Sequence, residues 1–293
     1  SGSCGGVLVD SGSTITVNPV VTTTYYVRAE GSCNITDCAS YTVVVNSTGT
    51  WLGTINTDWN TDGNWCGNVP SSGTDVIIPA SALNQPIIGD LDAVCNSISI
   101  QSGASLTIQN ANTLTVHGNW QNNGTFTPNS GNVIFNGSTT ISGSSTTDYY
   151  DLTINSTKTL TSHPVSVNIK HDWINNGTFL HNSGTVNFNG TAQQDISGET
   201  TFHNLTINNA SGVLAEDNIT VNAVLNLASE NASSTVGALD MKPVYTGDVL
   251  SSSNTLYMGA HATTIGVGDV TGRIVRDTIA ADVEYTFGNA NTS

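Results

Sequence analysis

The sequence predicts an all-β protein in which an incomplete sandwich is followed by a right-handed parallel β-helix, or solenoid. Three observations support this fold class. Thr, Val and Ile recur in short alternating runs between Gly and Asn-Gly turns, and good helix formers are scarce. A long motif repeats within the chain. Finally, only 10% of the 293 residues are charged, so Gly, Ser, Thr and Asn fill the polar positions.

Charge and hydropathy exclude several classes of partner. The 6 basic and 22 acidic residues give a net charge of -16, so we expect no binding to nucleic acid or to anionic lipid. No apolar run approaches the ~20 residues that a membrane-spanning helix needs, and we expect no membrane insertion. Any export signal is expected upstream of this sequence.

Residues 1–47 predict the C-terminal part of a truncated immunoglobulin-like module. Four short runs have the composition of strands: 6–9, 15–17, 24–29 and 41–45. In the last run Tyr41 and its second neighbours share one face, as in a half-buried antiparallel strand. Because such a sandwich uses about seven strands, we expect the missing strands upstream.

The five cysteines predict disulfides rather than a metal site, because no Cys-x-x-Cys pair is present. Cys66 and Cys95 flank one segment and are expected to pair. Cys4 is expected to pair with Cys33 or Cys38, which leaves one cysteine over. No cysteine follows Cys95.

Residues 48–96 predict a segment that caps the solenoid and contain a weak calcium candidate, Asp58, Asn60 and Asp62. These oxygen-bearing residues alternate before Gly63, as in the first half of a calcium loop. Val69 stands where the bidentate carboxylate of an EF-hand would be, so an EF-hand is excluded. An Asx-rich turn explains the same residues without a metal, and we expect no other cofactor.

Residues 97–293 predict a solenoid with a 53-residue repeat. Trp120 is followed by Trp173 at this offset, and the surrounding Asn-Gly, Phe and Leu-Thr-Ile motifs follow at the same or nearly the same offset. Six aromatic residues mark equivalent positions of the repeat, namely Trp120, Phe126, Phe135, Trp173, Phe179 and Phe188, and the four phenylalanines are expected to point inward. We expect the solenoid to continue beyond the end of this sequence.

A finer period of eight residues predicts the coil. The apolar pairs that begin at Ile98, Leu106 and Leu114 each enclose one Ser or Thr. Three such faces make a coil of about 24 residues, with Asn and Gly in left-handed conformations at the corners. The Asn-Gly pairs also suit two-residue hairpins, which leaves a meandering sandwich as the alternative.

The sequence shows little that predicts catalysis. The six histidines have no spacing typical of a zinc site, and His171 is interpreted as a surface or ladder position. Between residues 97 and 194 the acids are Asp148, Asp151 and Asp172, and coil stacking is not expected to bring two of them together. We therefore expect no enzyme and no catalytic residue.

Two groups of motifs resemble a known family. Residues 22–33, with Cys4 and Cys38, resemble the second half of immunoglobulin-like repeats in very large secreted surface proteins of gliding-type Gram-negative bacteria. The segment from Trp51 to Pro79 resembles the opening of the β-helix in the same proteins. The resemblance covers essentially the whole chain and implies export by the type IX route, but its motifs identify an architecture better than an activity.

These observations predict a non-catalytic, structural or adhesive segment of a long extracellular cell-surface protein or fibre. Its expected partners are other modules of the same polypeptide, neighbouring copies in a fibre, and surface glycans. The first alternative is a carbohydrate-binding solenoid module, and the second is a polysaccharide-cleaving β-helix enzyme, which would need two carboxylates ~5 to 10 Å apart.

Overall fold

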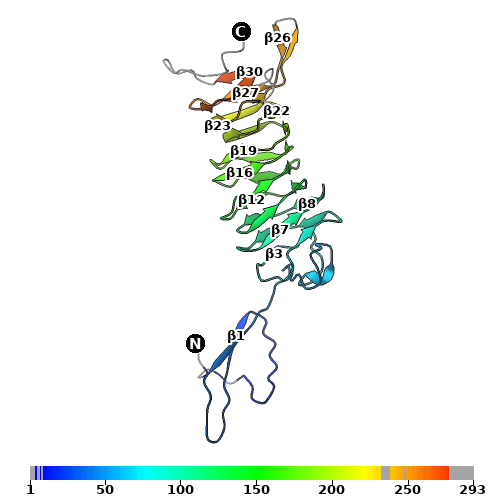
Figure 1. Ribbon diagram of the computed structural model, residues 1–293, viewed down its shortest axis with the longest axis vertical. Helices are drawn as coiled ribbons and strands as arrows, with labels where there is room; N and C mark the ends of the chain where they lie inside the picture. Colours follow the sequence, from blue (N-terminus) through cyan, green and yellow to red (C-terminus); the bar gives the residue numbers. More distant parts are fainter. Residues whose placement is uncertain (1–3, 5–6, 8, 232–237, 247–248, 277–293) are drawn as a thin grey trace. The chain divides into compact units, whose positions relative to one another are not determined.

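The computed structural model describes residues 4, 7, 9–231, 238–246 and 249–276, and Figure 1 traces them. The chain divides into two compact units, residues 1–48 and 49–293. Strands are the main regular structure of the described residues, and the helical content there is one 3-10 turn, η1 (Asp62–Asn64). No helix in the described part is long and apolar enough to cross a membrane.

The first unit contains one antiparallel pair of strands, β1 (Thr23–Val27) and β2 (Ala39–Val43), with Tyr25 opposite Tyr41. The expected run at 15–17 is not a strand, and 6–9 lies partly outside the described residues. None of the described residues before Gly49 is buried. Two strands without a second layer have nothing to pack against, so the sandwich expected for residues 1–47 is not seen.

The described residues of the second unit form a parallel β-solenoid of nine coils, each with three faces. Figure 1 shows the strands of successive coils stacked on one another. The first face of the coils is built, in order, by β3 (Val76–Ile78), β6 (Ile98–Ile100), β9 (Trp120–Asn122), β12 (Thr139–Ser142), β15 (Thr159–Thr161), β18 (Thr178–Leu180), the first halves of β21 (Thr200–Ile207) and β23 (Ile219–Leu227), and β27 (Thr255–Met258). After the ninth coil, β30 (Arg273–Arg276) pairs with β27.

The second and third faces follow in the same way. The second face is built by β4 (Ile87–Ile88), β7 (Ser105–Ile108), β10 (Thr125–Thr127), β13 (Asp148–Tyr149), β16 (Ser166–Ile169), β19 (Thr185–Phe188), the second halves of β21 and β23, and β28 (Thr263–Gly266). The third face is one nine-stranded sheet of β5 (Ala93–Cys95), β8 (Thr113–Val116), β11 (Asn132–Phe135), β14 (Asp151–Ile154), β17 (Trp173–Asn175), β20 (Gln194–Ser197), β22 (Val213–Ala215), β24 (Leu239–Asp240) and β29 (Val270–Thr271).

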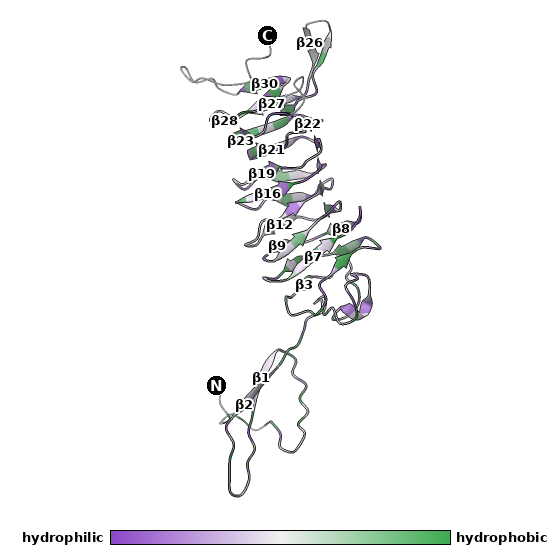
Figure 2. Cartoon of the chain, viewed as in Figure 1, coloured by the Kyte–Doolittle hydropathy of each residue, from purple (hydrophilic) through white to green (hydrophobic). Residues whose placement is uncertain are grey.

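The strand pairing confirms the solenoid and excludes the meandering sandwich. The named strands of the coils pair in parallel, and the antiparallel pair β25 (Val244–Thr246) and β26 (Val249–Ser252) is a hairpin inserted between β24 and β27. The apolar pairs of the eight-residue period occupy β6, β7 and β8, one on each face, and all six side chains are buried. Figure 2 shows green, hydrophobic positions recurring along the strands of the solenoid.

The coils are shorter than expected, and their lengths differ. Ile98 pairs with Trp120 of the next coil, whereas Val133 pairs with Leu152, which is closer to it along the chain. The long repeat of the sequence therefore spans eight strands and not a whole number of coils. Its first copy places Trp120 on the first face, and its second copy places Trp173 on the third.

The repeated motif encodes a packed cluster of aromatic rings. In the first copy Trp120, Phe126, Phe135 and Tyr149 contact one another, with the Trp120 and Phe126 centroids 4.9 Å apart. The second copy is built by the equivalent residues of the repeat, Trp173, Phe179, Phe188 and Phe202. All eight rings are at most 8% exposed. The four phenylalanines expected to point inward thus lie in the core, and so do the two tryptophans of the repeat.

Buried hydrogen bonds repeat with the rings. Trp120 Nε1 donates to Thr147 Oγ1 at 3.4 Å, and Trp173 Nε1 donates to Thr200 Oγ1 at 3.2 Å. Each threonine also accepts from a buried asparagine amide on the same strand as the tryptophan, at 3.1 and 3.0 Å. Because the indole N–H needs an acceptor when buried, the threonine belongs to the repeat as much as the rings do.

The glycines of the Asn-Gly pairs serve close packing rather than a left-handed turn, which corrects the expectation. Gly124 and its equivalent Gly177 do not have positive φ. A Cβ on either would lie 2.4 Å from a backbone carbonyl oxygen of the preceding coil, that of Ala104 or Lys158. The left-handed corners fall elsewhere, for example at Asn129, where φ is 44°.

The segment before the first coil is held by three buried tryptophans. Trp65 contacts both Trp51 and Trp59 edge to face, with ring centroids 4.8 and 4.7 Å apart. The buried Asn64 side chain accepts two backbone N–H bonds, from Ile55 and Asn56. This irregular segment is therefore densely packed, its tryptophans belong to the same hydrophobic core as the coils, and isolated bridges join it to β3 and β4.

The described residues contain one disulfide bond. Cys4 pairs with Cys38, with a Cα–Cα distance of 5.8 Å, and Cys33 is an exposed thiol. The expected bond between Cys66 and Cys95 is absent, because Cys95 is a thiol at an inward position of β5 and is 0% exposed. Cys66 lies instead in a loop, where its backbone N–H donates to the Thr50 carbonyl.

Candidate functional site

Acidic side chains recur at the start of strands on the third face, where they join one coil to the next. Asp92 accepts a hydrogen bond from the Thr113 backbone N–H at 2.7 Å. Asp151 accepts the N–H of Asp172, and Asp172 accepts that of Asp195, each at 3.0 Å. These carboxylates satisfy strand-end donors that the parallel ladder leaves unpaired.

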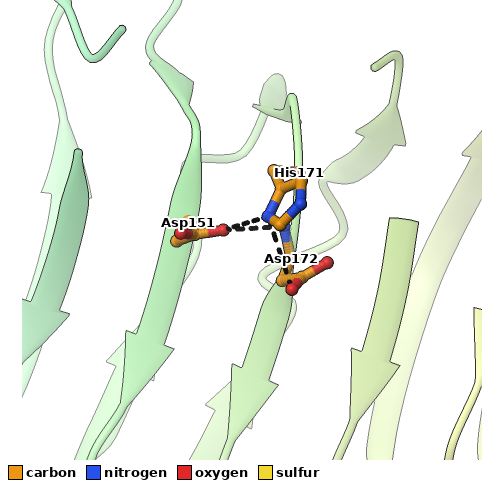
Figure 3. Close-up of side chains that lie close together, drawn as sticks. All are labelled: Asp151, His171 and Asp172. Carbon is orange, nitrogen blue, oxygen red and sulfur yellow. Dashed lines mark hydrogen bonds and ion pairs between the residues drawn. The ribbon is translucent and has the colours of Figure 1, made fainter. Parts of the chain in front are cut away.

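His171 lies between two of these carboxylates (Figure 3). Its Nδ1 is 2.7 Å from Asp151 Oδ1 and 3.3 Å from Asp172 Oδ2. The imidazole also stacks on the Tyr150 ring, with centroids 4.7 Å apart and planes 3° from parallel. The three side chains are about one quarter to one third exposed, so the cluster is fixed in place and still open to solvent.

Two carboxyl groups in and beside this cluster have a raised pKa. Burial raises the pKa of Asp172 above its ordinary value, and the neighbouring Asp151 charge adds to the rise. Burial raises the pKa of Asp195 as well, and the charges of Asp172 and Glu216 act in the same direction. Acids on successive coils therefore repel one another along the third face.

The expectation that coil stacking keeps the acids apart is wrong. Asp151 and Asp172 both contact His171, because they occupy equivalent places on neighbouring coils, where Leu152 pairs with Trp173. The eight-residue period predicts a longer coil, in which Asp151 and Asp172 would not occupy equivalent places. Asp172 follows Asp151 by the length of one coil in the structure, which the sequence period did not give.

The cluster offers one nitrogen and two oxygen ligands, whose ligand atoms lie within 4.8 Å of one another. Such a donor set suits a borderline divalent ion such as Zn²⁺ or Mn²⁺. Each ligand atom already has a partner inside the protein, and Asp151 Oδ1 has two, the imidazole and the Asp172 N–H. The cluster is thus complete as a hydrogen-bonded link between two coils.

Two of the three predicted calcium residues, Asp58 and Asp62, accept hydrogen bonds within their own loop. Asp58 Oδ1 accepts the Asn60 N–H, and Asp62 Oδ1 accepts the Val69 N–H, both at 3.0 Å. The Asn60 side chain donates to the Leu91 carbonyl at 3.3 Å. The Asp58–Asn60 contact is that of an Asx turn, and the other two contacts tie the loop to Val69 and Leu91.

A second imidazole contact lies at the corner between the first and second faces. The rings of His181 and His203 stack with centroids 5.2 Å apart. Burial lowers the pKa of His181, and the neighbouring His203 lowers it further. The wide sequence separation of the pair gave no sign that these two side chains meet.

Fold and site together define the chain as a parallel β-solenoid protein with a polar column on its third face. A family model described as a domain of unknown function, DUF8693, matches residues 50–179. This match covers the tryptophan-rich segment and the first five coils. No curated protein and no solved structure matches the chain.

Proposed function

We propose that the chain is a non-catalytic, structural and adhesive segment of a long protein exported to the cell surface. The observation that carries this proposal is the uninterrupted nine-stranded sheet on the third face. Eight spacings of about 4.8 Å make this ladder about 38 Å long. Every interior strand is hydrogen-bonded on both sides, so length is gained without a larger core.

Several features suit an extracellular location. The Cys4–Cys38 disulfide is of the kind that persists outside the cytosol. The net charge of -16 and the scarcity of charged residues suit a surface that repels anionic partners. The resemblance to surface proteins of gliding-type bacteria adds type IX export and an immunoglobulin-like module at residues 1–47 to the proposal.

The first unit supports a role as one module among others. Tyr41 is 73% exposed and Val44 63% exposed, although both belong to strand-like sequence. Apolar side chains of this kind are normally covered by a further layer of strands. The proposed partners are therefore other modules of the same polypeptide or neighbouring copies in a fibre.

Surface labelling of intact cells that express the protein tests the proposal. An antibody against the solenoid should label unpermeabilised cells, and external protease should abolish the label. Deletion of the segment should reduce attachment of the cells to a glycan-coated surface. Labelling that requires permeabilised cells would refute the proposal.

One observation favours a second candidate, a polysaccharide-cleaving enzyme. The Asp151 and Asp172 carboxylates both contact His171 from adjacent coils, and Asp172 has a raised pKa because of burial. Glycosidases use one carboxyl group with a raised pKa as general acid and a second as base or nucleophile. Release of reducing sugar from a polysaccharide, lost in Asp172→Asn, would favour this candidate, and no release from a broad panel would exclude it.

A further inference from the structure

A shallow depression lies on the first face of the last three coils. It is lined by Glu199, Thr200, Thr201, Asn218, Thr220 and Tyr257. Thr201 pairs with Thr220 and Thr220 with Tyr257, so these three outward side chains stand in one line across the coils. The Tyr257 side chain is 38% exposed.

The edge of the depression is fixed by a side-chain ladder. Asn218 Oδ1 accepts the Thr255 backbone N–H at 2.8 Å, and Asn218 Nδ2 donates to Glu199 Oε1 at 3.4 Å. These bonds hold the Glu199 carboxylate toward Asn218 and leave its second oxygen without a partner in the described part of the chain. A polar edge held in this way needs little reordering when a ligand binds.

The remaining polar groups of the depression are also unengaged. Within the described residues, the hydroxyls of Thr201, Thr220 and Tyr257 have no intramolecular hydrogen-bond partner, although they line one concavity. Together with Glu199 they offer three hydroxyls, which donate and accept, and a carboxylate that accepts. An exposed aromatic ring beside them offers a flat apolar surface.

We infer that this depression is a binding site for a neutral saccharide. A pyranose ring presents C–H groups on one face, which pack on an aromatic ring, and hydroxyls at its rim, which bond to carboxylate and hydroxyl groups. No Lys or Arg is among the described lining residues, and the chain carries a net charge of -16, so a uronate or sulfated sugar would be repelled. The inference rests on the adhesive part of the proposed function.

Calorimetric titration of the whole chain, residues 1–293, tests the inference. The probes are neutral hexasaccharides of glucose, mannose and xylose, with hexagalacturonate as the charged comparison. At least one neutral probe should bind. Tyr257→Ala should weaken binding at least tenfold, whereas Tyr257→Phe, which keeps the ring, should weaken it less than Tyr257→Ala. The matched control Tyr41→Ala, an exposed tyrosine of the first unit, should leave binding unchanged.

Three results would overturn the inference: no heat with any neutral probe at millimolar concentration, equal binding by Tyr257→Ala and the parent, or tighter binding of hexagalacturonate. Tyr257→Phe keeps the test valid if the alanine variant fails to fold. Loss of sugar binding would not change the outcome of surface labelling, so failure of this inference is distinguishable from failure of the proposed location.

Discussion

Replacing Phe135 by alanine should destabilise the solenoid strongly. The Phe135 side chain is 0% exposed and lies on β11, where Val116 and Ile154 are its partners on the adjacent coils. Removing a buried phenylalanine costs about 3 to 5 kcal/mol. Its ring also contacts Trp120 and Tyr149, with centroids 6.3 and 5.9 Å away. Such aromatic pairs are worth about 0.5 to 1.5 kcal/mol each, so we expect the upper part of that range.

Thermal unfolding followed by circular dichroism measures this cost. For a unit of this size, about 1 kcal/mol shifts Tm by about 2 to 4 °C, so a cost of about 4 to 5 kcal/mol should lower Tm by roughly 8 to 20 °C. The repeat equivalent Phe188→Ala should also destabilise, but less, because within the described residues Phe188 has one ring contact, with Phe202. Val165 is 68% exposed, and Val165→Ala should change stability by no more than about 0.5 kcal/mol. A Phe135 variant that melts with the parent would refute the inward assignment.

Three further predictions follow from burial, charge and close packing. Iodoacetamide should label the exposed Cys33 of the native chain but reach Cys95 only in denaturant, because burial raises the pKa of the Cys95 thiol; rapid native labelling of Cys95 would contradict this. Asp195→Asn should raise Tm at pH 7. The gain in Tm should shrink as the pH falls through the raised pKa of Asp195, because the parent carboxyl then binds a proton and the repulsion is relieved. A gain in Tm that does not depend on pH would contradict this prediction. Gly124→Ala should cost about 1 to 3 kcal/mol in denaturant unfolding, whereas Gly73→Ala, with open space around its Cβ, should be nearly neutral; equal stability of the two variants would contradict the packing role of Gly124.

The strand faces could be predicted because alternation is a local property. Ile98, Leu106 and Leu114 mark one strand on each face, and each apolar pair is buried. The two aromatic clusters could also be located, since Trp120 and Trp173 repeat at a constant offset. The faces on which the two clusters lie could not be predicted, because the face depends on the number of strands within the repeat and not on the length of the repeat.

The polar cluster could not be predicted because it depends on the length of each coil. The coil that begins at Val133 is shorter than the coil that begins at Ile98, so no single period aligns the acids. The Asp151 and Asp172 carboxylates meet at His171 only because the coil between them has the matching length. The packing role of Gly124 could not be predicted for a related reason. A side chain at this position is excluded by a carbonyl of the adjacent coil and not by the conformation of its own turn.

The coil stacking itself is tested most directly by one distance. Thr115 and Ser197 occupy the same outward column of the third face, four coils apart, through Ile134, Thr153 and Ile174. Spin labels on Thr115→Cys and Ser197→Cys, in a chain with Cys33 and Cys66 replaced by serine, allow measurement by double electron–electron resonance. Four spacings of about 4.8 Å place the two backbones about 19 Å apart. We predict a narrow distribution of distances between the two spin labels, centred near that value. A broad distribution, or one centred well beyond about 30 Å, would contradict the stacked solenoid.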